Sequence, residues 1–345
     1  MAAVAFRKHA TLADPDCLVD VTTERPVPGP HDLLVAVRAV SVNPVDTKIR
    51  AGLVAAPDAV QYLGWDAAGI VEAVGEAVTL FRPGDTVYYA GSFDRSGSNA
   101  QFHLVDERIV GHMPRSLSFA EAAALPLTSL TAWQLLFDRL GMPPGKQAYA
   151  GSLLVLGGAG GVGSMLIQLA RRLTGLTVIA TASRTQSRDW CLALGAHHVI
   201  DHLQSLPEQI NALPVPPVTH VAALSNTAGH WTELAELIAP QGRLAIITDH
   251  DVLDAVPFKA KSVSLHWEMV FTRPLFGTQD MVAQHGILDE VAALVDIGVL
   301  RSTVNRVLHP LDAARLREAH RLVEDGGMTG KIVVARSAED LVRTD

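Results

Sequence analysis

The stretch LLVLGGAGGVGSMLIQLARR, residues 153–172, decides the fold of this chain. Its first four residues, 153–156, are all apolar, which is typical of a buried strand. A glycine-rich turn follows at 157–163. Apolar residues then recur at the spacing of one helix face, at Val162, Met165, Leu166, Leu169, Ala170 and Leu173. The stretch therefore predicts a strand, a tight turn and a helix in succession.

The glycines of this turn have the spacing G-x-G-x-x-G, which is typical of dinucleotide-binding sites. A side chain in such a turn would hold the backbone away from a pyrophosphate, and the free N–H groups at the start of the helix attract the phosphates. The alternative is a purely structural turn, but the strand before it and the helix after it favour a cofactor site. The predicted cofactor-binding residues here are Gly158, Gly160, Gly161, Val162 and Gly163.

The composition indicates a globular chain of about two domains. It has 345 residues, of which 48% are hydrophobic, and a net charge of −8 without a basic run, which argues against a nucleic-acid partner. The two cysteines, Cys17 and Cys191, lie too far apart in sequence to indicate a metal motif or a disulfide framework. Neither a signal peptide nor a membrane span is recognisable. We therefore expect a soluble, cytoplasmic protein without a membrane association.

Residues 4–110 are rich in short apolar runs separated by proline, glycine and aspartate, which predicts a β-barrel or sandwich. No helix of standard length stands out before residue 118. Polar residues follow several of these predicted strands, where binding sites are common. They include Asn43, Tyr89 and Asn99, although Asn in such places also serves simply as a turn residue.

From residue 118 onward, helices and strands alternate, which predicts a doubly wound α/β unit with a parallel sheet. Helices are expected at 118–125 and about 129–140, and residues 206–217, which contain four prolines, are expected to form an irregular loop. The predicted strands after 153–156 are 177–182, 197–200, 219–225 and 243–248, and the predicted helices between them include 184–195 and 230–240.

The end of the second strand of this unit indicates the type of cofactor. NAD sites carry an acidic residue about twenty positions after the glycines, where it binds the ribose 2′-hydroxyl. Here Ser183 and Arg184 occupy that place, and no Asp or Glu lies between 176 and 188. Because arginine offers forked donors to phosphate oxygens, this pattern favours NADP(H), with Arg188 as a further candidate. The alternative is that Arg184 is only a solvated residue at the start of a helix.

The last quarter contains a possible strand at 262–271, helices at about 280–297 and 312–326, and a final strand at 330–335. Strand-type sequence after a complete wound unit suggests that the chain returns to its first domain. The sequence lacks a G-x-S-x-G nucleophile motif and zinc-ligand spacing of Cys and His. The histidines of GAHHVIDH (195–202) fit a solvated strand edge better than a metal site.

Several segments resemble the medium-chain dehydrogenase/reductase superfamily, and more narrowly its zinc-independent quinone oxidoreductase branch and a bacterial subgroup often labelled zinc-type alcohol dehydrogenase-like. The segments are AVSVNPVDTKIRAG (39–52), LGWDAAGIVEAVGEAVTLFRPGDTVYYAG (63–91), NAQFHLVDERIVGHMP (99–114), AAALPLTSLTAW (122–133), GGAGGVGS (157–164) and TASR (181–184). The resemblance implies a GroES-like β-barrel domain (1–125), a Rossmann NADP(H)-binding domain (126–270) and a C-terminal segment (271–345) that returns to the first domain.

The chain departs from the zinc alcohol dehydrogenases of this superfamily at their metal ligands. Asn43 and Trp65 stand where those proteins carry Cys and His, and Leu127 stands where they carry a third ligand. An amide, an indole and an alkyl group do not form a zinc site, so no metal is expected.

The resemblance implies transfer of a hydride from NADPH to quinones or α,β-unsaturated carbonyl compounds, by a homodimer. Two alternatives remain open: a redox-silent NADPH-binding protein, and a metal-dependent secondary-alcohol or aldehyde dehydrogenase. The expected substrate-oxygen ligands are Asn43, Tyr89 and Asn99, the expected apolar pocket walls are Trp65, Met269 and Phe271, and the further expected cofactor ligands are Thr131, Ser183, Arg184, Thr248 and Lys331.

Overall fold

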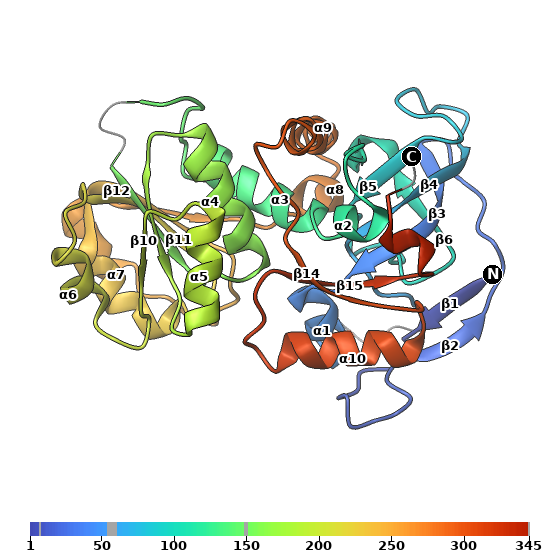
Figure 1. Cartoon of the computed structure of the whole chain (residues 1–345), viewed down its shortest axis with the longest axis horizontal. Helices are drawn as coiled ribbons and strands as arrows, with labels where there is room; N and C mark the ends of the chain where they lie inside the picture. The colour runs from blue at the N-terminus through green and yellow to red at the C-terminus, as the bar shows by residue number, and fades with distance from the viewer. Residues whose placement is uncertain (7, 54–60, 148–150, 344–345) are drawn as a thin grey trace. The chain divides into compact units, whose positions relative to one another are not determined.

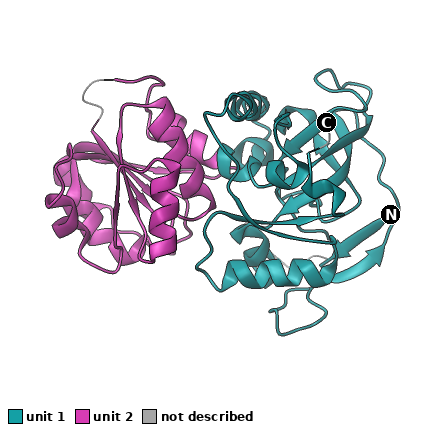
Figure 2. Cartoon of the chain, viewed as in Figure 1, with its two compact units in different colours: residues 1–130, 271–345 teal, residues 131–270 magenta. Residues whose placement is uncertain are grey.

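The computed structural model describes residues 1–6, 8–53, 61–147 and 151–343. The chain forms two compact units, which Figure 2 colours separately. Unit 1 combines residues 1–130 with residues 271–345, and unit 2 consists of residues 131–270. Because both ends of unit 2 join unit 1, the C-terminal part of the chain completes the unit that the N-terminal part began.

Unit 2 is built on a six-stranded parallel sheet in the order β10-β9-β8-β11-β12-β13. Figure 1 labels β10, β11 and β12 of this sheet, with α4 and α5 beside it. The order reverses next to β8, where the glycine-rich turn follows the strand, and such reversal points are where α/β sheets bind ligands. The strands are β8 (Ser152–Leu156), β9 (Thr177–Thr181), β10 (His198–Ile200), β11 (Val218–Ala223), β12 (Ile238–Ile246) and β13 (Ser264–Trp267).

The helices of unit 2 follow the predicted alternation with one exception. Residues 206–217, which we expected to be irregular, begin with a short helix because the Ser205 side chain accepts a hydrogen bond from the Glu208 N–H and caps it. The helical elements are α4 (Gly161–Leu173), α5 (Thr185–Leu194), α6 (Leu206–Asn211) and α7 (Trp231–Leu237), with short 3-10 turns at Ala228–His230 and Val256–Lys261.

Unit 1 is built on a seven-stranded, mainly antiparallel sheet in the order β14-β15-β3-β4-β5-β7, with β6 paired to β3, beside the separate hairpin β1-β2. The final strand β15 pairs with β3, so that Val334 lies opposite Val40. The C-terminal part of the chain therefore contributes a strand to the sheet that the N-terminal part forms. The strands are β1 (Ala2–Ala5), β2 (Val19–Thr22), β3 (Asp32–Ser41), β4 (Ala67–Val74), β5 (Thr86–Tyr89), β6 (Phe102–Asp106), β7 (Val110–His112), β14 (Val304–Leu308) and β15 (Lys331–Ala335).

One short helix precedes residue 118, in the region where no helix of standard length was expected. Helix α1 (Pro44–Ala51) begins directly after Asn43, with Pro44 at its first position, and ends at Gly52, whose φ of 117° terminates it. The remaining helices are α2 (Phe119–Ala123), α3 (Pro126–Trp133) with a π-helical continuation over Gln134–Arg139, α8 (Thr272–Phe276), α9 (Ala283–Asp296) and α10 (Ala313–Glu324), and 3-10 turns occur at Glu107–Ile109 and Glu339–Leu341.

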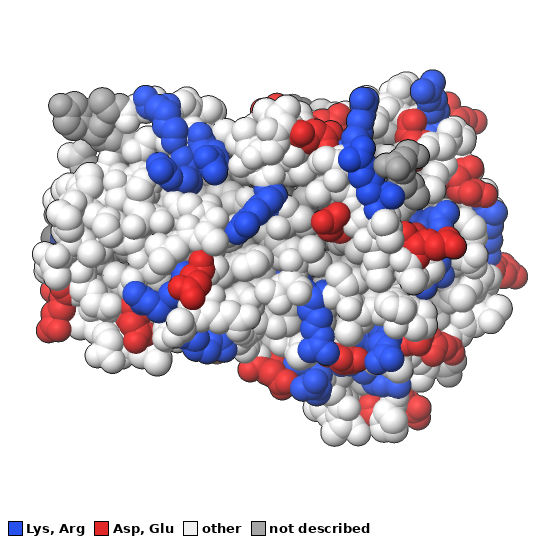
Figure 3. All heavy atoms as spheres, viewed as in Figure 1, with Lys and Arg blue, Asp and Glu red and all other residues white. Residues whose placement is uncertain are grey.

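Among the described residues, no helix is both long enough and apolar enough to cross a membrane. On the face drawn in Figure 3, basic and acidic side chains are interspersed over the surface. Unit 2 has its own apolar core, in which the strand residues Leu154, Ile179, Val221 and Leu244 are fully buried.

Candidate active site

The glycine turn of unit 2 has the expected form: β8 leads into it and α4 leaves it. A Cβ on Gly163 would lie 2.4 Å from the Gly157 carbonyl oxygen, and one on Gly158 would lie 2.7 Å from the Ala180 Cβ. These two glycines are therefore required by the packing of the unit itself. Gly160 differs, because the nearest atom to a Cβ there is 3.5 Å away.

Gly160 is the N-cap of α4, and it has no side chain to cap the first turn. The backbone N–H groups at the start of the helix, at Gly161, Val162 and Gly163, thus lie at the positive end of the helix dipole, where a phosphate can accept hydrogen bonds from them. Packing therefore does not require glycine at 160, and the open space there would let a phosphate approach the backbone.

This contrast gives a first prediction. We expect Gly160→Ala to keep the melting temperature of the wild type but to weaken NADPH binding about tenfold or more, because its methyl group takes the space of the pyrophosphate. The matched control, Gly163→Ala, should lower the melting temperature, because its methyl group meets backbone oxygens. Calorimetric titration with NADPH and thermal denaturation measure the two effects. Unchanged NADPH affinity in Gly160→Ala would place the pyrophosphate elsewhere.

The residues that we expect to bind the 2′-phosphate on the ribose lie at the end of β9. Ser183 follows the strand, and Arg184 is the N-cap of α5. Arg188 forms its hydrogen bonds within the protein. Its guanidinium donates to the backbone oxygens of Val199 at 2.9 Å and Ala182 at 3.4 Å. These bonds count against Arg188 as a phosphate ligand and leave Ser183 and Arg184 as the candidates.

The other cofactor candidates of unit 2 lie on separate elements. Thr131 is buried in α3. Thr248, just after β12, shares hydrogen bonds of 2.7 Å with both Thr227 and His250. Of the GAHHVIDH histidines, His198 lies in β10, the edge strand of the sheet, whereas His197 precedes the strand and His202 follows it. His197 Nδ1 accepts from the Val178 N–H at 2.9 Å.

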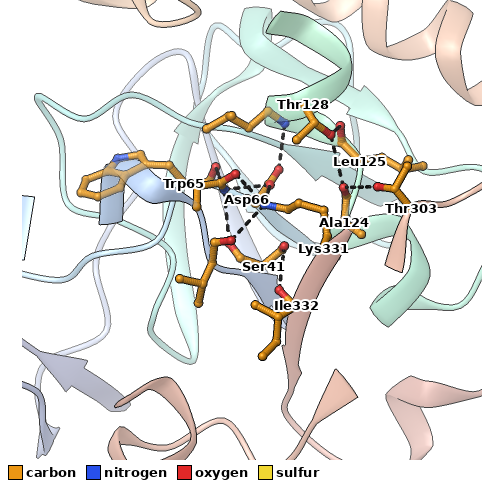
Figure 4. Close-up of polar contacts among 12 residues, drawn as sticks. Ser41, Trp65, Asp66, Ala124, Leu125, Thr128, Thr303, Lys331 and Ile332 are labelled. Carbon is orange, nitrogen blue, oxygen red and sulfur yellow. Dashed lines mark hydrogen bonds and ion pairs between the residues drawn. The ribbon is translucent and has the colours of Figure 1, made fainter. Parts of the chain in front are cut away.

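Unit 1 contains a buried polar cluster of Asn43, Asp46, Asp66 and Lys331. Figure 4 shows Asp66 and Lys331 side by side. The Lys331 ammonium donates to the Val42 backbone oxygen at 3.0 Å and to Asn43 Oδ1, and it lies 3.2 Å from Asp66 Oδ2. Lysine has three donors. The three contacts occupy the three N–H donors of Lys331 within unit 1, and this counts against the expected contact of Lys331 with cofactor phosphates.

Asp66 connects the cluster. Its Oδ2 accepts from Asn43 Nδ2 at 2.9 Å and its Oδ1 accepts from the Leu127 N–H at 2.8 Å. Burial raises the pKa of Asp66, and the nearby Lys331 ammonium opposes that rise. Burial likewise lowers the pKa of Lys331, and Asp66 opposes the fall. Each charge therefore stabilises the other inside unit 1.

Asp46 adds a second carboxyl group to this cluster. Its Oδ2 accepts from the Asn43 N–H at 2.7 Å, whereas its buried Oδ1 lacks a hydrogen-bond partner among the described residues. Burial raises the pKa of Asp46 to about 7, so this carboxyl group is partly protonated near neutral pH.

The residues expected to bind the substrate oxygen are placed by unit 1. Tyr89, at the end of β5, is fully buried and its hydroxyl lies 3.1 Å from His103 Nδ1, while His103 Nε2 donates to the Ser96 oxygen at 2.7 Å. Burial raises the pKa of Tyr89 and lowers that of His103 to about 4. His103 is a residue that the sequence reasoning missed, although it lies within the alternating stretch QFHLVD (101–106). Asn99 is buried, and its backbone pairs with Leu63.

The three expected apolar walls differ in exposure. Trp65 and Phe271 are buried in unit 1, where the Phe271 ring packs edge-on against Phe93 at 5.3 Å between centroids. Met269 belongs to unit 2 and is 44% exposed.

Comparison with known proteins identifies the family. Residues 29–133 match the alcohol dehydrogenase GroES-like domain, and residues 194–334 match the zinc-binding dehydrogenase domain. A zinc-type alcohol dehydrogenase-like protein of Staphylococcus aureus is 39% identical over 97% of this chain and 99% of its own length. The chain belongs to the medium-chain dehydrogenase/reductase superfamily.

Solved structures of this superfamily have the same fold. A protein of Rhizobium etli that carries the name zinc-dependent alcohol dehydrogenase is 51% identical, with a TM-score of 0.93 over 97% of this chain and 98% of its own. A quinone oxidoreductase of Escherichia coli, solved with NADPH, is 25% identical, with a TM-score of 0.81 over 97% of this chain and all of its own (100%). The predicted combination of a GroES-like domain with a Rossmann domain is confirmed, as is an oxidoreductase of this superfamily.

Proposed function

We propose that this medium-chain dehydrogenase/reductase transfers a hydride from NADPH to a quinone or an α,β-unsaturated carbonyl compound, without zinc. The observation that carries the proposal is the buried Lys331–Asn43–Asp66 cluster. Asn43 stands, by resemblance, at one of the positions where the zinc enzymes of this superfamily hold their metal, and Trp65 and Leu127 stand at the others. Without a Lewis acid to activate an alcohol, the substrate must itself accept a hydride readily.

The side chains at these positions do not fit zinc. Asn43 already uses its amide nitrogen on Asp66 and its amide oxygen on Lys331. Trp65 offers only an N–H donor, and Leu127 offers an alkyl group. In addition, the described residues contain no group of three or more His, Cys, Asp and Glu side chains placed to hold a metal ion. The names of the zinc-binding domain and of the relatives therefore give no support for a metal in this chain.

The preference for NADPH rests on the end of β9. Ser183 and Arg184 stand where an NAD site carries an acid, and the E. coli quinone oxidoreductase with the same fold was solved with NADPH. NADPH, when bound, supplies the hydride. The chain holds the pyrophosphate on the first turn of α4 and the 2′-phosphate with Ser183 and Arg184.

The negative charge that develops on the acceptor determines what the side chains of unit 1 must do. In an enone the hydride adds to the β-carbon, the C=C electron pair moves toward the carbonyl oxygen, and a proton from solvent completes the saturated ketone. Unit 1 must orient the acceptor and stabilise the charge that develops on that oxygen. A homodimer stays a prediction, for which β13, as an edge strand of the sheet, is the candidate contact.

Turnover of a panel of acceptors tests the proposal and separates it from its two alternatives. We expect metal-free protein to oxidise NADPH with cyclohex-2-enone and with 1,4-benzoquinone, at rates that neither a chelator nor added zinc changes. A redox-silent NADPH-binding protein would bind NADPH and consume none with any acceptor. A secondary-alcohol dehydrogenase would instead oxidise alcohols with NADP⁺, and a chelator would abolish its activity.

A further inference from the structure

The indole of Trp65 carries an unusual donor. Trp65 is only 3% exposed, and its Nε1–H lacks a hydrogen-bond partner among the residues that the structure describes. Burying an N–H group without a partner costs free energy, so such groups are uncommon and call for an explanation. Other tryptophans of the chain satisfy this group: Trp231 Nε1 donates to the Asp254 oxygen and Trp190 Nε1 to Ser164 Oγ, each at 2.8 Å.

The backbone next to Trp65 is tightly packed. Gly64 has a φ of 113°, and a Cβ there would lie 2.7 Å from both Ser98 Oγ and Asn99 Oδ1. A Cβ on Gly91 would lie 3.9 Å from Trp65 Cδ1, the carbon next to Nε1, so the backbone at Gly91 also lies near the donor edge of the ring. The indole points away from Asp66 and Lys331 (Figure 4). The Trp65 donor therefore belongs to a buried side chain that directly follows a tightly packed glycine.

Two of the expected oxygen ligands, Asn43 and Tyr89, use their polar hydrogens within unit 1. Asn43 Nδ2 donates to Asp66 Oδ2. Because His103 Nε2 donates to the Ser96 oxygen, its Nδ1 is an acceptor, and the Tyr89 hydroxyl is the group that donates to it. Among Asn43, Tyr89 and Trp65, therefore, only Trp65 has a polar hydrogen without an acceptor.

We propose that the Trp65 Nε1–H donates a hydrogen bond to the carbonyl oxygen of the substrate. This inference rests on the proposed function and assigns Trp65 a polar role where the sequence predicted only an apolar wall. The indole nitrogen is a donor only, so the site selects ligands whose oxygen is an acceptor, as in quinones and enones. The bond strengthens as negative charge develops on that oxygen, which makes Trp65 a catalytic residue as well as a binding residue.

The variant Trp65→Phe tests the proposal because it keeps an aromatic ring and removes the N–H group together with part of the fused ring system. We expect kcat/KM for cyclohex-2-enone to fall about tenfold or more while the affinity for NADPH is unchanged. Trp231→Phe, which removes a satisfied indole donor far along the chain in α7, is the matched control and should leave kcat/KM unchanged. A kcat/KM within error of the wild type in Trp65→Phe would overturn the proposal.

Nuclear magnetic resonance gives a readout that does not depend on turnover. The chain has five tryptophans, and the indole signal missing in Trp65→Phe identifies that of Trp65. We expect cyclohexanone, a carbonyl compound without a reducible C=C bond, to move this N–H signal downfield in the presence of NADP⁺. No movement would refute the role of Trp65 even if NADPH turnover occurs. Movement without any NADPH turnover would instead refute the proposed function and leave the carbonyl contact standing.

Discussion

Replacing Lys331 with methionine is expected to lower the free energy of unfolding by about 3–5 kcal/mol, because the carboxylate of Asp66 would remain buried without its counter-charge. Asp66 is fully buried, and its remaining donors are the Asn43 amide and the Leu127 N–H. Urea denaturation of the wild type and the variant measures the loss. The effect is larger than that of an ordinary surface ion pair because water cannot solvate the carboxylate that is left.

Two controls separate this cause from a general effect of removing a lysine. The double variant Lys331→Met with Asp66→Asn removes both charges and should recover part of the loss, because no buried charge is left unpaired. Arg321→Met removes one partner of the exposed Arg321–Asp325 pair and should change the free energy of unfolding by less than about 1 kcal/mol. A loss below about 1 kcal/mol in Lys331→Met would contradict the buried ion pair.

Placing an acid at the end of β9 is expected to reverse the cofactor preference. Ser183→Asp would set a carboxylate against the 2′-phosphate of NADPH, and repulsion of several kcal/mol corresponds to a loss of about 100-fold or more in kcat/KM for NADPH. The same carboxylate can accept a hydrogen bond from the 2′-hydroxyl of NADH, so kcat/KM for NADH should rise. Steady-state kinetics with both cofactors and one acceptor measure the change in their ratio.

Arg184 and Arg188 supply the matched comparison for this prediction. Arg184→Ala should weaken NADPH selectively, because it removes a donor to the 2′-phosphate. Arg188→Met should lower stability without changing the ratio of the two cofactors, because its guanidinium binds backbone oxygens of the protein. If Ser183→Asp left the ratio of NADPH to NADH unchanged, the 2′-phosphate would not lie at the end of β9.

The wound unit could be predicted from the sequence because its signals are local. The strand β8, the glycine turn and α4 are continuous in sequence, and their hydrophobic periodicity directly indicates which face is buried. The elements that the sequence did not indicate are short and have weak signals. Helix α1 has eight residues and begins at a proline within a β-rich region, and α6 has six residues among prolines.

The polar cluster could not be predicted because its members come from distant parts of the chain. Lys331 and Asn43 are 288 residues apart, and only the pairing of β15 with β3 brings them together. The same is true of the role of Tyr89: its partner His103 is fourteen residues away on another strand, so the sequence alone left its hydroxyl free. Sequence patterns thus indicated which polar residues lie in unit 1. The tertiary fold determines which of their N–H and O–H groups have an acceptor within the protein.

The central claim is that NADPH gives its hydride directly to a conjugated carbonyl acceptor without a metal. The most direct test is transfer of a label from NADPH deuterated at C4 of the nicotinamide, in chelator-treated protein, to cyclohex-2-enone. We predict that mass spectrometry and nuclear magnetic resonance of the product find one deuterium at the β-carbon of cyclohexanone. Recovery of unreduced enone, or reduction at the carbonyl carbon to an alcohol in a reaction that requires zinc, would contradict the account.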